Sequence, residues 1–83
     1  MYYEAIFDPT ENEIYNEEAQ QFAGKLIAIQ DGWVINEGPH KGEHCFYVPN
    51  STIGTIPKSD LKDIKSIPVI RWKEILKSMG VET

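Results

Sequence analysis

The sequence predicts a small, mainly-β domain that ends in an amphipathic α-helix at about residues 67–79. In the first two thirds of the chain, short runs of aromatic and β-branched residues alternate with turn signals, as is typical of a small barrel or sandwich. After Ser66 the apolar residues recur every three or four positions, which is the period of a helix. We expect a single domain, residues 1–83, with a barrel in residues 1–64 and a helix packed on it in residues 65–83.

The first half of the chain is expected to supply two strands with a polar excursion between them. Residues 2–7 (YYEAIF) are rich in aromatic and β-branched side chains and run into a turn signal, so they are predicted to be a strand. The polar excursion contains a short helical turn at residues 17–22, and residues 22–30 form the next strand. Asp31-Gly32 is a turn signal that should end this strand.

The second half is expected to contain a β-hairpin, a short strand and a helical turn. Residues 33–36 and 43–48 are strand candidates, and the loop EGPHKG between them carries the glycines and the proline that a bend needs. Residues 53–57 (IGTIP) predict a short strand, and residues 58–64 (KSDLKDI) predict a single helical turn capped by Ser59.

The C-terminal helix has one apolar face. Ser66 is expected to cap its start, and Gly80 stands where a helix stops. The apolar face consists of Val69, Trp72, Ile75, Leu76 and Met79. We expect this face to pack on the barrel, because each large side chain stabilises the fold by roughly 1.5–3 kcal/mol when it is buried. A partner that covers the face is the alternative.

Charge is distributed unevenly along the chain. The formal net charge is -5; residues 1–22 carry six acidic side chains and no basic one, whereas residues 58–77 carry six basic side chains against three acidic ones. Nucleic-acid binding generally requires a basic footprint, which only residues 58–77 could supply. The acidic segment is either a solvated surface or a surface that attracts basic partners.

The cysteine count and the lack of a long apolar run bear on the location of the protein. Cys45 is the single cysteine, so no intramolecular disulfide can form, and small exported domains usually need such bridges. No stretch approaches the roughly 18 apolar residues that would span a bilayer, and the start has no basic region followed by an apolar run. We therefore expect a cytoplasmic protein without membrane contact.

The stretch GPHKGEHC (residues 38–45) gathers two histidines, a glutamate and the cysteine, but it does not predict a metal site. Its glycines and proline argue against a helix, which is the structure that would place His40 and His44 on one face. On a strand, His44 and Cys45 point to opposite faces, so at most two ligands converge, whereas a structural zinc site needs four. We find no motif of nucleophilic or phosphate-binding chemistry either, and expect no catalytic residue, metal or cofactor.

The order of these features resembles the Src-homology-3 family over residues 3–64. Residues 5–9 (AIFDP) are similar to the ALYDY opening of that family, and the acidic residues after them take the place of its RT loop. DGW, ending in Trp33, stands where the family has its first tryptophan, and residues 54–61 (GTIPKSDL) resemble its closing motif G-x-x-P-S-N-Y-V. The resemblance implies a five-stranded barrel that acts without catalysis as a protein-interaction module.

The resemblance also implies a partner surface. In peptide-binding members, aromatic side chains and a proline line a groove, and acidic residues of the RT loop pair with arginine or lysine of the ligand. The matching residues here are Phe7, Glu11, Glu13, Glu17, Trp33 and Pro57. Pro9 and Asp60 stand where the family has tyrosines, so the expected ligand is a basic protein surface rather than a proline-rich peptide. Whether Trp33 is exposed or belongs to the core stays open at this point.

A second resemblance is local and implies a different partner. Residues 33–48 (WVINEGPHKGEHCFYV) are similar to the KOW motif of ribosomal and transcription-elongation proteins, in which a strand runs into G-P-x-K-G and returns. It implies an accessory of the transcription or translation machinery that contacts RNA, ribosome or polymerase. The candidate nucleic-acid contacts are His40, Lys41, Arg71, Lys73 and Lys77. A third interpretation is a small acidic inhibitor, of the kind that mobile elements encode, which occupies the basic groove of a host protein.

Overall fold

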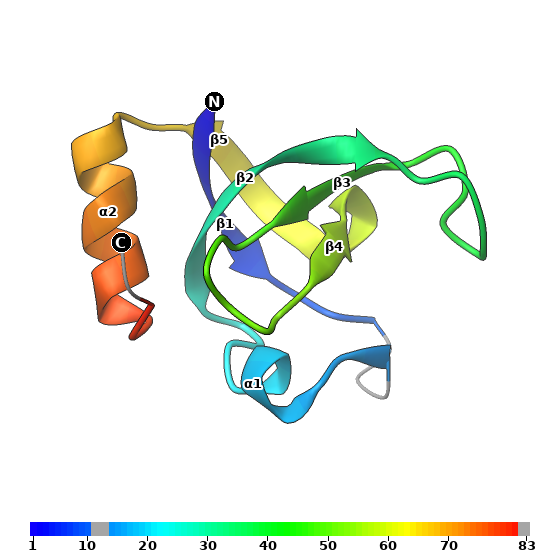
Figure 1. Ribbon diagram of the computed structural model, residues 1–83, viewed down its shortest axis with the longest axis horizontal. Coiled ribbons are helices and arrows are strands. Elements are labelled where there is room, and N and C mark those ends of the chain that lie inside the picture. Colours follow the sequence, from blue (N-terminus) through cyan, green and yellow to red (C-terminus); the bar gives the residue numbers. More distant parts are fainter. Residues whose placement is uncertain (11–13, 82–83) are drawn as a thin grey trace.

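The computed structural model describes residues 1–10 and 14–81, and this part of the chain forms a five-stranded antiparallel sheet with a C-terminal helix (Figure 1). The strands are β1 (Tyr2–Phe7), β2 (Leu26–Val34), β3 (His44–Tyr47), β4 (Thr55–Pro57) and β5 (Leu61–Ser66). The helical elements are α1 (Glu17–Gln20), the 3₁₀ turn η2 (Lys58–Asp60) and α2 (Val69–Ser78). The strand order in the sheet is β4-β3-β2-β1-β5. The predicted small, mainly-β domain with a C-terminal helix is confirmed.

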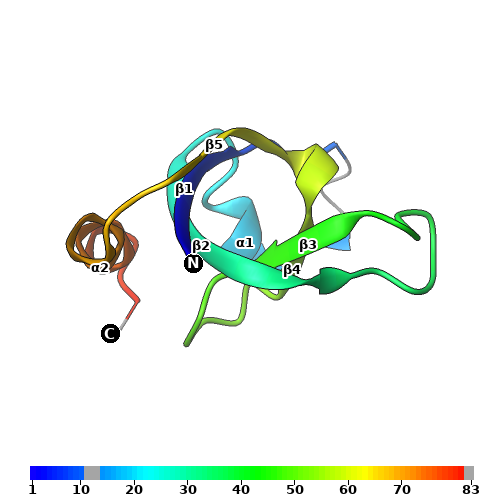
Figure 2. The same ribbon diagram turned by 90° about the horizontal axis from the view of Figure 1, so that it is seen from above.

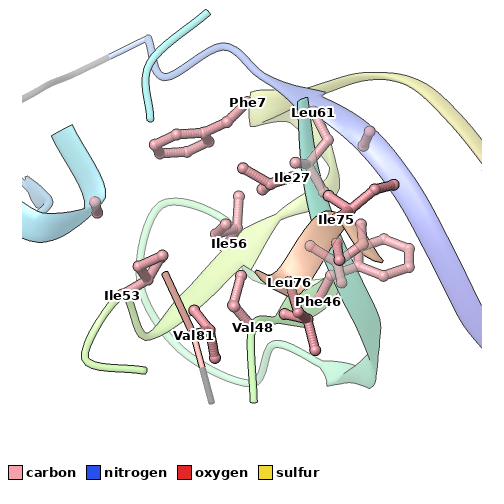
Figure 3. Close-up of a cluster of buried hydrophobic side chains, with 14 of the residues drawn as sticks. Phe7, Ile27, Phe46, Val48, Ile53, Ile56, Leu61, Ile75, Leu76 and Val81 are labelled. Atoms are coloured by element: carbon pink, nitrogen blue, oxygen red, sulfur yellow. The ribbon is translucent and has the colours of Figure 1, made fainter. Parts of the chain in front are cut away.

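The sheet curls around the core, as Figure 2 shows. Side chains alternate between the two faces of a strand, so Ala5 and Phe7 of β1 point to the same side, and both are fully buried. Ala5 lies opposite Ile27 of β2, which is buried as well. Every strand and both α-helices contribute to this core (Figure 3). The buried apolar side chains are Ala5, Phe7, Tyr15, Ala19, Ile27, Ala28, Ile29, Phe46, Val48, Ile53, Ile56, Leu61, Trp72, Ile75, Leu76 and Val81.

Helix α2 packs against β1 and β2. The indole Nε1 of Trp72 donates a hydrogen bond to the backbone oxygen of Ile29 (2.9 Å), and its ring lies 4.6 Å from the ring of Tyr2. The helix begins at Val69, directly after Pro68, and no side chain caps it. Ser66, the predicted cap, belongs to β5 instead. Within the described residues, no helix combines the length and the apolar composition that crossing a membrane requires.

The turn predicted at Asp31-Gly32 is wrong. Strand β2 runs through both residues to Val34, and its pairing with β3 is irregular between Asp31 and Val34. Gly32 is needed there because of a close approach, not because of a turn: a Cβ at this position would lie 2.7 Å from the backbone oxygen of Cys45. The predicted hairpin is present, with β2 and β3 antiparallel on either side of the loop.

The helical turn predicted for residues 58–64 is only half as long. Lys58–Asp60 form η2, which follows Pro57 and has no side-chain cap, so Ser59 does not cap it. From Leu61 onward the chain is strand β5, paired with β1. Asp63 adopts a left-handed conformation (φ 54°) where the register between β5 and β1 shifts. This irregularity interrupts the alternation of side chains by which a strand is recognised in a sequence.

Candidate partner-binding groove

An open groove of about 460 Å³ crosses the outer surface of β2, β3 and β4, and we call it the aromatic groove. Its lining consists of Trp33, Tyr47, Val48, Pro49, Asn50, Ser51, Gly54 and Thr55. Tyr47 and Thr55 lie opposite each other on β3 and β4, next to Phe46 and Ile56, whose side chains are buried. The period of two in the strands therefore turns Tyr47 and Thr55 away from the core and into the groove.

Trp33 forms one side of the groove and is 55% exposed. Its exposure follows from the length of β2. The pairing of β1 with β2 ends at Tyr2 and Gln30, so the last part of β2 projects beyond β1 and toward the hairpin loop (Figure 2). The question that the sequence left open is settled: Trp33 is a surface residue, whereas Trp72 is in the core.

The β3–β4 loop, residues 48–54, supplies five more lining residues and is hydrogen-bonded internally. The Ser51 hydroxyl donates to the backbone oxygen of Val48 (2.8 Å) and accepts from the backbone N–H of Ile53 (3.4 Å). Asn50 and Gly54 are left-handed, with φ of 56° and 83°, which are angles that asparagine and glycine tolerate best. Val48 and Ile53 are buried, so the loop is anchored near both ends.

Helix α1 places acidic side chains beside this loop. Asn16 caps the helix by accepting a hydrogen bond from the backbone N–H of Ala19 (2.9 Å), and its side-chain amide donates to the backbone oxygen of Thr52. The Thr52 hydroxyl donates to the carboxylate of Glu18. Glu17, one of the predicted partner residues, is exposed at the start of the helix. The Glu18 contact therefore lies at Thr52, which stands between the lining residues Ser51 and Gly54 in the sequence, and the lining itself is uncharged.

A buried carboxylate fixes the chain that leads into α1. Asp60 is fully buried and accepts hydrogen bonds from the hydroxyls of Tyr15 (2.6 Å) and Thr10 (3.1 Å). Burial, followed by the hydrogen bond to Asp60, raises the pKa of the Tyr15 hydroxyl above its ordinary value of 10.0. The ring of Tyr15 also meets Phe7 edge to face at 5.0 Å. Asp60 therefore ties η2 to the segment that precedes α1.

The predicted partner residues differ in where the structure places them: two are buried, two are exposed and two lie outside the described residues. Phe7 is fully buried and Pro57 is buried too, so both belong to the interior and neither can form part of a contact surface, which corrects the prediction. Phe7 faces inward because it ends the alternating core face of β1. Trp33 and Glu17 are exposed, and Glu11 and Glu13 lie outside the described residues.

Sequence reasoning missed Tyr47 and Pro49 as lining residues of the groove. Tyr47 could have been found from the alternation along β3, in which it follows the buried Phe46. Pro49 could not, because its place depends on how the β3–β4 loop folds.

The basic residues considered for nucleic acid do not form one surface. His40 and Lys41 lie in the hairpin loop at one end of the molecule, and α2, which carries Arg71, Lys73 and Lys77, lies at the other end (Figure 1). His40 is engaged locally, since its Nδ1 lies 2.7 Å from the Glu43 carboxylate. The contacts of Glu43 with His40 and then with Ser59 lower the pKa of Glu43 below its ordinary value of 4.5.

The histidines and the cysteine of residues 38–45 do not converge on one point. His44 Nε2 lies 3.4 Å from Asp31 Oδ1 and is partly exposed, whereas Cys45 is fully buried. Among residues 1–10 and 14–81, no group of three or more histidine, cysteine, aspartate or glutamate side chains is arranged to hold a metal ion. The candidate site on this surface is therefore the aromatic groove.

Comparison with known proteins found no matching family, no similar curated protein and no similar solved structure.

Proposed function

We propose that this protein is a non-catalytic interaction module that captures an arginine- or lysine-bearing segment of a partner protein at the aromatic groove. The observation that carries the proposal is the exposure of Trp33 in a groove that is also lined by the internally hydrogen-bonded β3–β4 loop. A cation over an exposed indole gains about 0.5–1 kcal/mol, and more when it is desolvated. A fixed loop lowers the entropy that binding would otherwise cost.

Charge supports a basic partner. The net charge of -5 attracts cationic segments and accelerates their encounter, and the nearest acid that the structure ties to the β3–β4 loop is Glu18, at Thr52. The lining itself contains no charged residue, so the affinity would come from stacking and apolar contact, and the acids would provide steering. The acidic inhibitor of a basic host groove remains a variant of this proposal, because it would also rely on the acidic net charge of the chain.

We also propose that the fold is a Src-homology-3-like barrel and that the protein is cytoplasmic. Support for the fold comes from the curled sheet of five antiparallel strands, and from the 3₁₀ turn η2 inside residues 54–61, where the resemblance to the closing motif lies. Support for the location comes from Cys45, a lone cysteine that is fully buried as a thiol.

The test is a titration followed by amide NMR shifts. The probes are a Gly/Ser-rich peptide with a central Arg-Lys pair and the same peptide with Gln in place of both. We expect the basic peptide to shift the signals of Trp33, Tyr47 and the β3–β4 loop, and the neutral peptide to bind at least about tenfold more weakly. Trp33→Ala should weaken the basic peptide to a similar degree. Ile70→Ala is the matched control, because Ile70 is also exposed and lies on α2, away from the groove.

Equal binding of both peptides, or unchanged binding by Trp33→Ala, would contradict the proposal. The alternative of an RNA-contacting accessory is tested with labelled RNA at low and moderate salt. Binding that weakens steeply with salt and depends on Lys41 would favour that alternative over the one proposed.

A further inference from the structure

Strand β2 has a free edge beyond the end of β1. The β1 ladder reaches only the Tyr2 and Gln30 pair, whereas β2 continues to Val34 and the hairpin extends it to Ile35. On the other edge, β3 pairs with this part of β2. In the described part of the chain, residues 31–35 therefore have a strand on one edge alone, and we call their other side the free edge.

Backbone hydrogen bonds fix which groups point to the free edge. The N–H of Ile35 donates to Glu43 (2.9 Å), and its carbonyl oxygen accepts from Gly42 (2.9 Å), so both groups of Ile35 point toward the returning strand. Neighbouring residues of a strand point their backbone groups in opposite directions. The N–H and C=O of Val34, which pairs with His44, consequently point away from β3 and toward the free edge.

The side chains at this edge are unusually apolar. Trp33 and Val34 are 55% and 54% exposed, and as consecutive strand residues they project from opposite faces of the sheet. Soluble proteins usually protect an open edge with lysine, proline or a covering loop. Residues 26–40 contain no lysine or arginine, and the single proline among them, Pro39, lies in the hairpin loop.

We propose that an extended, basic and apolar segment of a partner protein binds at the free edge as an additional strand of the sheet. This proposal rests on the proposed function and names how the backbone of the partner is held. Charge favours a basic segment: Glu37, two residues beyond the free edge, is exposed, and the chain carries a net charge of -5. The Asp31 carboxylate at the other end of the edge already lies 3.4 Å from His44 Nε2 and 3.9 Å from the N-terminal amine. A residue of the added strand opposite Trp33 would lie on the same face at about 5 Å, within reach of the indole for a lysine or arginine side chain.

The experiment uses the full chain and a short peptide that alternates lysine and valine. Its matched control is the same peptide with all of its central backbone nitrogens methylated, which keeps the charge and removes the donors. We expect the first peptide to protect the Val34 amide from hydrogen exchange, and the methylated peptide to bind about tenfold more weakly.

Two variants test the same point on the protein. Val34→Pro and Val34→Ala both remove the valine side chain, but only the proline removes the N–H at the free edge. Proline is tolerated at such an edge position, and the amide spectrum verifies the fold. We expect Val34→Pro to bind the unmethylated peptide about tenfold more weakly than Val34→Ala does.

Equal affinities for the two peptides and for the two variants would overturn strand addition. If the unmethylated peptide still shifted Trp33 and Tyr47 in that case, the proposed function would stand and strand addition alone would fail. If neither peptide bound, the proposal that the occupant is a basic and apolar segment would be overturned. If the wild type self-associated as its concentration rose and Val34→Pro did not, a second copy of this chain would be the occupant. That result would also overturn the proposal that a partner protein adds the strand.

Discussion

Asp60 illustrates how a buried charged side chain can be a structural anchor. It lies in η2 and is fully buried. Its carboxylate is satisfied by the hydroxyls of Tyr15 and Thr10, and its backbone oxygen accepts from the N–H of Asp8 (2.8 Å). A buried carboxylate without such donors would be strongly destabilising. Asp60 is therefore an internal anchor between η2 and the segment that precedes α1.

Asp60→Asn should destabilise the protein by about 1.5–3 kcal/mol, which is the usual cost of losing hydrogen bonds to a charged group. The amide keeps one acceptor oxygen but turns an N–H group toward a hydroxyl that now donates to the carboxylate. The measurement is the free energy of unfolding in urea. Asp63→Asn is the matched control, because Asp63 is exposed and left-handed and asparagine tolerates that conformation. Its effect should stay within about 0.5 kcal/mol, and equal losses for both variants would contradict the role of Asp60.

At the same scale, the sequence separates the two tryptophans only in part. Trp72 lies in a helical period with Ile75 and Leu76, and all three are buried, so periodicity was sufficient to predict its place. Trp33 follows a glycine in a strand whose pairing is irregular, and its exposure depends on where β1 ends. The point where β1 stops pairing with β2 depends on contacts between segments far apart in the sequence, so no local sequence pattern predicts it.

At the scale of elements, the sequence predicts the strands whose buried and exposed residues alternate and the helix whose apolar residues recur every three or four positions. It does not predict elements whose conformation depends on contacts with distant segments. β1, the hairpin of β2 and β3, and α2 all follow their local patterns. The strand character of Asp31-Gly32 was missed because Gly32 serves a contact with Cys45 rather than a turn. β5 was missed because its two lysines and its aspartate are exposed and its pairing with β1 is irregular. The groove depends on the β3–β4 loop, whose conformation arises from hydrogen bonds that span the loop and reach α1.

The hairpin loop should make stability depend on pH through Glu43. Its contacts with His40 and the N–H of Ser59 (3.0 Å) join the loop to η2 and lower the pKa of Glu43 below 4.5. A lowered folded-state pKa means that the stabilisation is complete above the ordinary value, and that it is lost as the pH falls through the folded-state value. Glu43→Gln should therefore cost stability near neutral pH, and the difference from wild type should shrink as the pH falls below about 4.5.

The measurement is the free energy of unfolding of both proteins at a series of pH values on each side of 4.5. Glu74→Gln on the exposed face of α2 serves as the control for the loss of one surface carboxylate. A difference between wild type and Glu43→Gln that stays constant over this series would show that the carboxylate does not hold the loop.

At the scale of the whole molecule, folding brings the acidic start and the basic end of the chain together. Glu4 of β1 lies 3.4 Å from Arg71 of α2 and 4.0 Å from Lys65 of β5, and Asp8 lies 2.7 Å from Lys62. Three of the six basic residues between 58 and 77 are thus paired with acids from the first strand and the turn after it. The polarity that is visible along the sequence is partly neutralised in the fold, which weakens the case for a basic nucleic-acid surface.

The sheet and α2 should unfold together as one cooperative unit. Trp72, Ile75, Leu76 and Val81 belong to the same buried cluster as Ala5 and Ile27, and Trp72 is hydrogen-bonded to the central strand β2. A domain of 83 residues has little core to spare, so a sheet that lost these contacts would expose the face of β1 and β2 that the helix covers.

In the variant Trp33→Phe, Trp72 is the single tryptophan, and its fluorescence reports on the packing of α2 alone. We expect its urea transition to coincide with the transition of the sheet followed by far-ultraviolet circular dichroism, as two-state unfolding requires. A fluorescence change at lower urea than the loss of sheet signal would mean that α2 detaches first, and that the sheet is stable without it.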